Sequence, residues 1–153
     1  MLNLNKKLTQ RFKVAGLLTV VFLSGCGSHP ADAPTAELHP FTGIVLVDNE
    51  PAHGAVVTLH PVEDNGLGVV TPSGLADDLG LFAVTTYQPG DGAPAGTYRV
   101  TVSWAEVLNP GASEPDYGKS KLPLRYSQPD SSGLEIAIVA GTNDPRTLEL
   151  TSK

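Results

Sequence analysis

The 153-residue sequence contains little cysteine and no long hydrophobic run. Because Cys26 is its single cysteine, no disulfide can form within the chain, and stability has to come from packing. The apolar run near the start, residues 14–23, is ten residues long, whereas an α-helix needs roughly 20 to cross a bilayer. We therefore expect no permanent transmembrane helix in this segment.

The first 25 residues have the order of parts that is typical of an export signal. Four basic residues lie between positions 6 and 13, the uncharged run 14–23 follows, and small residues precede Cys26. The sequence LSGC at 23–26 resembles the lipobox of bacterial lipoproteins. This resemblance implies removal of residues 1–25 and attachment of diacylglycerol to the sulfur of Cys26. The alternative is an ordinary secretory signal followed by a chance free cysteine.

The lipobox resemblance also predicts a location. Two or three acyl chains at Cys26 give a stable membrane anchor, since each buried methylene contributes about 0.8 kcal/mol. Lipoproteins with aspartate after the cysteine are often kept at the inner membrane, whereas this chain has Gly27. We expect an exported protein on the periplasmic face of the outer membrane or on the cell surface, with the membrane as partner through Cys26.

The mature chain is strongly acidic once the signal is removed. Four of the ten basic residues and none of the sixteen acidic residues lie in residues 1–25, which leaves a net charge of 6 − 16 = −10. Such a surface repels nucleic acid phosphates and anionic head groups, so neither is an expected partner. Solubility alone is a sufficient explanation of the acidity.

Beyond the signal, the chain divides into a tether and one domain. Residues 26–38 are rich in Pro, Ala and small polar residues without periodicity, which predicts a flexible tether. Residues 39–152 consist of short β-rich runs separated by turn residues, and no segment has an amphipathic helical period. The predicted strands are 43–47, 55–60, 69–76, 81–87, 97–104, 134–140 and 146–151. They predict an all-β, seven-stranded antiparallel β-sandwich.

The clearest predicted strand is Thr97–Trp104. Its residues alternate so that Tyr98, Val100, Val102 and Trp104 share one face, as in a half-buried antiparallel strand. We expect that face to lie in the core and Thr101 to face away from it. A tryptophan there also needs an acceptor for its indole N–H.

Two motifs resemble the carboxypeptidase regulatory-like, transthyretin-like domain. Residues 76–82 (ADDLGLF) are similar to its D-x-x-G-x-F hairpin, and residues 94–102 (PAGTYRVTV) to its P-A-G-x-Y-x-V-x-V strand. The resemblance covers about residues 40–151 and includes small bacterial lipoproteins with a single such domain. It implies a transthyretin-like (prealbumin-like) sandwich, and it identifies a fold rather than a reaction.

The sequence offers little for catalysis or metal binding. No histidine pair has the helical i, i+4 spacing of a zinc site, and there is no Gly-x-Ser-x-Gly elbow. His53 and His60 could meet across a hairpin and are the remaining metal candidate, while the acidic turns resemble no calcium loop. Transthyretin-like hydroxyisourate hydrolases end in Tyr-Arg-Gly-Ser, a tail that LELTSK at 148–153 does not match. We predict no catalytic residues, no metal and no cofactor.

The longest stretch without a strand pattern, residues 105–121, is the predicted partner-binding loop. Loops of this length are uncommon in compact domains unless they are functional or disordered. Its candidate contact residues are Tyr117, Asp116 and Asn109, since tyrosine is enriched at interfaces. The alternative is an idle insertion, because added loop length costs little free energy. The predicted function is a non-enzymatic, lipid-anchored envelope protein with a β-sandwich binding or structural module, whose partner is an envelope protein or a small ligand. The alternatives are a small-ligand carrier or sensor that acts as an oligomer and, as the weakest, a transthyretin-like hydrolase.

Overall fold

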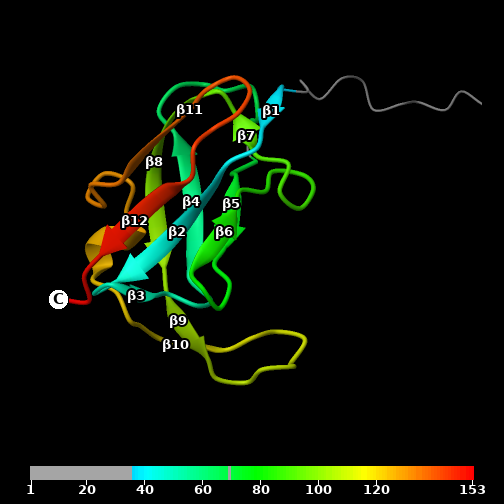
Figure 1. Cartoon of the computed structure of the whole chain (residues 1–153). Coiled ribbons are helices and arrows are strands. Elements are labelled where there is room, and N and C mark those ends of the chain that lie inside the picture. Colours follow the sequence, from blue (N-terminus) through cyan, green and yellow to red (C-terminus); the bar gives the residue numbers. More distant parts are fainter. Residues whose placement is uncertain (1–35, 69) are drawn as a thin grey trace, which may run out of the picture. The chain divides into compact units, whose positions relative to one another are not determined.

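The computed structural model of the protein describes residues 36–68 and 70–153 (Figure 1). The predicted signal, the lipidation site Cys26 and the tether up to residue 35 lie outside these residues. In the part that is described, no helix is long and apolar enough to cross a membrane.

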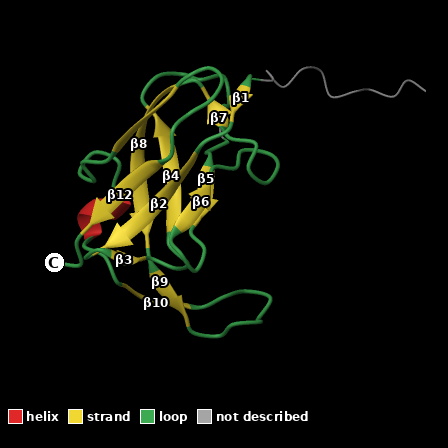
Figure 2. Cartoon of the chain, in the orientation of Figure 1, coloured by secondary structure: helices red, strands yellow, loops and turns green. Residues whose placement is uncertain are grey.

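The domain is all-β (Figure 2). Its strands are β1 (Leu38–His39), β2 (Thr42–Val47), β3 (Glu50–Pro51), β4 (Val56–Pro61), β5 (Ser73–Leu75), β6 (Leu81–Ala83), β7 (Ala93–Pro94), β8 (Gly96–Ser103), β9 (Ala105–Val107), β10 (Tyr117–Ser120), β11 (Glu135–Ile138) and β12 (Arg146–Leu150). A single 3₁₀ turn, η1 (Leu124–Ser127), follows Pro123, whose fixed φ suits the start of a helical turn.

The first of two main sheets has the order β11-β8-β4-β5 and is antiparallel throughout. The long strand β8 lies at its centre, with β4 on one side from Val56↔Ser103 to Pro61↔Tyr98 and β11 on the other. Position 74 of β5 is glycine because a Cβ there would lie 2.9 Å from the Phe82 ring and 2.9 Å from the Ala83 carbonyl oxygen, both of which belong to β6. The two sheets therefore pack closely at β5.

The second main sheet joins β12, β2 and β3, with β6 also paired to β2. Strand β12 runs parallel to β2, from Arg146↔Gly43 to Leu150↔Val47. The prediction of an entirely antiparallel sandwich is therefore wrong at this pair. Only a short hairpin forces neighbouring strands to be antiparallel, and nearly the whole domain separates β2 from β12 in the chain. The broader prediction, an all-β sandwich, is confirmed.

Two small sheets complete the fold. Strand β1 pairs with β7, so pairing begins at Leu38, the last residue of the predicted tether. Strand β9 pairs with β10. The expectation that residues 105–121 contain no strand is wrong, because these two strands form a hairpin that projects from one end of the domain, opposite β1 (Figure 1).

The core lies between the main sheets and confirms most of the predicted face pattern. In β8, Tyr98, Val100 and Val102 are fully buried or nearly so. They belong to one buried cluster with inward residues of both main sheets, namely Val57, Leu59, Ile136 and Ile138 from the first sheet and Val45, Leu148 and Leu150 from the second. Trp104 lies at the edge of this core and is only partly buried. Thr101 faces the opposite side but is buried as well, and its Oγ1 lies 2.9 Å from His60 Nε2.

The two family-like motifs have structural roles. In the first, one Asp77 carboxylate oxygen accepts the N–H groups of Leu79 and Leu81 at 2.8 and 2.9 Å. Gly80 has a φ of 75°, and a Cβ there would lie 2.6 Å from the Val45 carbonyl oxygen, which only glycine avoids. In the second, the Tyr98 hydroxyl donates to the Pro94 carbonyl at 2.7 Å. Both motifs close turns.

Candidate functional site

The hairpin of β9 and β10, which we call the arm (residues 105–120), forms one wall of the candidate site. Its base is fixed to the sheet because Lys121 N–H donates to the Trp104 carbonyl at 2.7 Å. Within it Tyr117 lies opposite Val107 and Ser120 opposite Ala105, with a bulge between the two pairs. The arm thus continues β8 beyond the body of the domain.

The tip of the arm is held by two of the three residues predicted to contact a partner. The Asn109 side chain accepts the backbone N–H of Asp116, and its Nδ2 donates to the Asp116 carboxylate at 2.9 Å. Leu108 N–H also donates to the Asp116 carbonyl at 2.8 Å. The structure therefore brings Asn109 and Asp116 together as a clamp that closes the loop. Tyr117, the third predicted contact residue, is 65% exposed.

Tyr117 opens onto an apolar groove of about 470 Å³ between the arm and the body. The body supplies Val56 from β4 and Leu75 from β5, which lie opposite each other in the sheet. The arm supplies Val107 and Tyr117. These four side chains are 37%, 67%, 41% and 65% exposed in that order. Four large apolar side chains exposed around one hollow form a patch of the kind that marks a binding surface.

Sequence reasoning misses the body side of this groove, although a signal is present. Val56 and Leu75 fall in predicted strands at positions next to the inward residues, where a solvent-facing strand usually carries polar side chains. Because Val57 and Leu59 face the core, alternation places Val56 on the outer face of β4. An apolar residue on that outer face is therefore the sequence signal for the body side of the groove.

Trp104 also lines the groove. Its indole N–H donates to the His53 carbonyl at 2.9 Å, which is the acceptor that the sequence requires. The Lys121 ammonium lies 4.6 Å from the centroid of the same ring, a cation–π distance. His53 Nδ1 lies 3.0 Å from an Asp78 carboxylate oxygen. The groove is thus an apolar hollow with charged groups at its rim.

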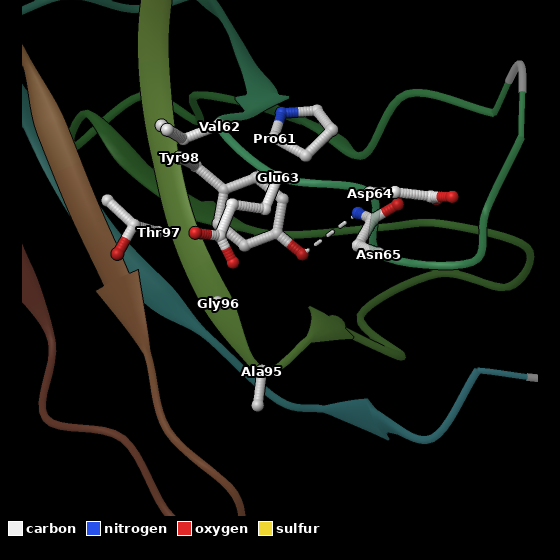
Figure 3. Close-up of a pocket in the computed structure, with 9 residues that line it drawn as sticks. All are labelled: Pro61, Val62, Glu63, Asp64, Asn65, Ala95, Gly96, Thr97 and Tyr98. Carbon is white, nitrogen blue, oxygen red and sulfur yellow. Dashed lines mark hydrogen bonds between the residues drawn. The ribbon is translucent and has the colours of Figure 1, made fainter.

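A second, more polar hollow of about 330 Å³ lies near the other end of β8 (Figure 3). The Tyr98 hydroxyl points toward the Asn65 amide, whose Nδ2 donates to it at 3.2 Å. Burial raises the pKa of the Tyr98 phenol, against a smaller opposing effect of the bond from Asn65. Asp64 and Asn65 use side-chain oxygens to accept the N–H groups of Gly66 and Leu67. These polar groups hold the loop to β8.

The structure separates the two histidines proposed as a metal pair. His53 precedes β4 and pairs with Asp78, whereas His60 lies near the far end of β4 and bonds to Thr101. Within residues 36–68 and 70–153, no three His, Cys, Asp or Glu side chains form a group that could hold a metal ion.

The buried polar side chains of the described residues are also scattered. His39 Nδ1 accepts the N–H of Gly141 at 3.2 Å, Thr101 bonds to His60, and Ser132 Oγ accepts the N–H of Leu134 at 3.3 Å. They come from β1, β8 and the loop before β11. Each of the three side chains makes a hydrogen bond to another part of the described domain.

Comparison with known proteins identifies no family. The sequence matches no protein-family model and no curated protein. Among solved structures, a 9R-lipoxygenase from Cyanothece PCC8801 aligns with 78% of this chain at 18% identity and a TM-score of 0.36. The chain spans 18% of the length of that enzyme. This distant likeness concerns a small all-β part of the lipoxygenase, and nothing about the activity of this chain follows from it.

Proposed function

We propose that this protein is a non-enzymatic, lipid-anchored envelope protein whose β-sandwich binds a partner through the groove beside the arm. The observation that carries the proposal is the gathering of Val56, Leu75, Val107 and Tyr117 around one hollow, all of them exposed. Monomeric soluble proteins seldom leave such a patch uncovered unless it binds something. A groove lined by large apolar side chains excludes water when it is filled, which gives the binding free energy.

The position of the groove in the domain supports this proposal. The described chain begins at β1, and the arm lies at the opposite end of the domain (Figure 1). Cys26 precedes Leu38 by twelve residues, which reach at most about 40 Å when fully extended. A domain anchored through Cys26 would therefore be tethered at the end opposite its groove, and the point of attachment would not lie at the groove.

The transthyretin-like assignment remains part of the proposal. It rests on the hairpin at 76–82 and the strand at 94–102, whose turn and core roles agree with the motifs of that family. The carrier alternative rests on groove size, since about 470 Å³ falls within the range of small-molecule sites. A protein partner is favoured because the lining residues Leu75 and Tyr117 are about two-thirds exposed, so they lie at the surface of the domain.

Site-specific photocrosslinking in intact cells tests the proposal. A photoreactive residue at Tyr117 should give a discrete adduct, whereas one at Leu124, which is equally exposed but belongs to η1, should not. The Tyr117 adduct should disappear when Leu75→Ser makes the opposite wall of the groove polar. Equal adducts at both positions, or an adduct that survives Leu75→Ser, would show that the groove is not the binding site.

A further inference from the structure

The strand β9 has one open edge, and this edge borders the groove. Strand β8 is paired on both sides, but its last pair with β4 is Val56↔Ser103. Before Val56 the chain turns away at Gly54, whose φ is 78° and whose N–H donates at 2.9 Å to the carbonyl of Ala76, the residue after β5. Strand β9 prolongs β8 past this point. Among the described residues, β9 therefore pairs with β10 alone.

The register shows which backbone groups of β9 are open. Leu108 N–H donates to the Asp116 carbonyl, so these two residues form a hydrogen-bonded pair. In an antiparallel ladder the next pair, Val107 and Tyr117, is then a non-hydrogen-bonded one, and the N–H and C=O of Val107 point away from β10. The bond from Lys121 to Trp104 places Ala105 in the same situation. Ala105 and Val107 thus present donors and acceptors two residues apart, as an edge strand does.

This open edge faces the side on which β4 would have continued. Val100 N–H donates to the Leu134 carbonyl, so the even-numbered residues of β8 direct their backbone groups toward β11. The odd-numbered residues face β4, and Ala105 and Val107 continue that series. Both residues line the groove. Among residues 36–68 and 70–153, no strand pairs with β9 on the side that is in line with β4 and beside the apolar groove.

We propose that the partner enters this place as an extended segment of another protein, which pairs with β9 as an added strand. The inference rests on the proposed binding function and specifies how the groove is used. Backbone bonds to Ala105 and Val107 would hold the segment, and alternate apolar side chains would enter between Leu75, Val56 and Tyr117.

The charge around the groove indicates which residues the partner's segment should carry. Glu106 lines the same groove, Asp77 and Asp78 follow β5, and the chain from Cys26 onward has a net charge of 6 − 16 = −10. The basic residue at the groove, Lys121, lies over the Trp104 ring. A segment that alternates apolar residues with Lys or Arg is therefore complementary to this surface.

A peptide selection with a backbone scan tests this binding mode. A displayed library of random peptides about ten residues long, enough to span a strand, is selected against the full chain in mild detergent. The best peptide is then resynthesised with one N-methyl group at each position in turn. Binding is followed by the fluorescence of Trp104, the single tryptophan of the chain. For strand addition, affinity should fall about tenfold or more at every second methylated position, because only alternate N–H groups face β9.

A pair of protein variants tests the edge from the other side. Val107→Pro removes the outward N–H and should weaken binding by about tenfold, whereas Val107→Thr keeps the N–H and the β-branched shape and should weaken it less than about threefold. Thermal unfolding of both variants should match the parent, because the N–H of Val107 points away from β10. If Val107→Pro changes the thermal unfolding, its effect on binding is not specific to the lost N–H, and the N-methyl scan alone tests strand addition.

The outcomes separate this inference from the proposed function. If peptides bind and Leu75→Ser abolishes binding, but the N-methyl scan shows no alternation, the groove is a binding site and strand addition is wrong. If no selected peptide depends on Leu75, both proposals are wrong. Dimerisation of the chain through β9, seen as a doubled mass that Val107→Pro abolishes, would also overturn the inference of a foreign partner.

Discussion

The hydroxyl of Tyr98 is a single group on which a turn and a loop both depend. It donates to the Pro94 carbonyl at 2.7 Å and accepts from Asn65 Nδ2 at 3.2 Å, while the ring is fully buried. Tyr98→Phe leaves the ring and removes both bonds. We expect the free energy of unfolding to fall by about 1–3 kcal/mol, because a buried carbonyl loses its donor.

Urea unfolding measures this effect, and Tyr87 provides the matched control. Tyr87 is 52% exposed, so Tyr87→Phe should change the free energy of unfolding by less than about 0.5 kcal/mol. Equal effects of the two substitutions would show that the Tyr98 hydroxyl does not stabilise the turn.

Asp91 makes stability depend on pH. Burial raises the pKa of its carboxyl, but hydrogen bonds from the backbone N–H groups of Thr86, Gln88 and Tyr87, at 2.7–2.9 Å, outweigh this and lower the pKa below its ordinary value. A carboxylate with a lowered pKa in the folded state stabilises above its unfolded pKa of about 3.9, and this contribution is lost as the pH falls through the folded pKa.

Asp91→Asn isolates this contribution. The parent should be more stable than the variant near neutral pH, and the difference in the free energy of unfolding should shrink as the pH falls from about 6 to about 3. Urea unfolding across this range is the measurement, with the other carboxyls cancelling between the two proteins. A difference that stays constant with pH would exclude the carboxylate of Asp91 as its source.

At the level of elements, burial decides what could be predicted from the sequence. Strand β8 is clear because its alternate residues lie in the core and its period therefore appears in the chain. Strands β9 and β10 carry mostly exposed residues, so they have no such period and exist because they pair with each other. The parallel pairing of β12 with β2 depends on the path of the whole chain between these two strands, and local sequence patterns do not encode that path.

Sheet pairing also limits which residues of the candidate site can be predicted from the sequence. Tyr117 can be found because an aromatic residue in a long polar loop stands out in the sequence. Its companions in the groove, Val56 and Leu75, belong to strands about 20 residues apart that only sheet pairing brings together. Asn109 and Asp116 are predicted from the sequence as contact residues, and the hydrogen bond between their side chains could not be predicted, since it depends on how the loop closes.

The arm itself can be shortened without loss of the fold. Leu108 and Asp116 form a hydrogen-bonded pair, and such a pair accepts a two-residue turn. Replacing residues 109–115 with Asn-Gly should change the free energy of unfolding by less than about 1 kcal/mol, because a shorter loop costs less entropy and these residues belong to no part of the core. Thermal or urea unfolding tests this, and a loss above about 2 kcal/mol would mean that the tip packs against the body.

For the whole molecule, the central prediction is how it is held at the membrane. The acidic domain repels anionic head groups, and the described residues contain no helix able to span a bilayer. We propose that attachment depends on a lipid at Cys26, because the segment around it resembles a lipobox. The sulfur is the acceptor of the diacylglyceryl group, and signal cleavage follows that modification in the lipoproteins that this sequence resembles.

Cys26→Ser should therefore leave the chain unlabelled by radioactive fatty acid and at the mass of the uncleaved form, because a serine hydroxyl does not replace the thiol as acceptor. Ser24→Ala keeps a small residue before the cysteine, so it should be labelled and cleaved like the parent. Both positions precede β1, which begins at Leu38, and we expect unfolding of the domain to be the same in all three proteins. Normal labelling of Cys26→Ser would refute the lipid anchor, and the groove would then belong to a protein attached in some other way.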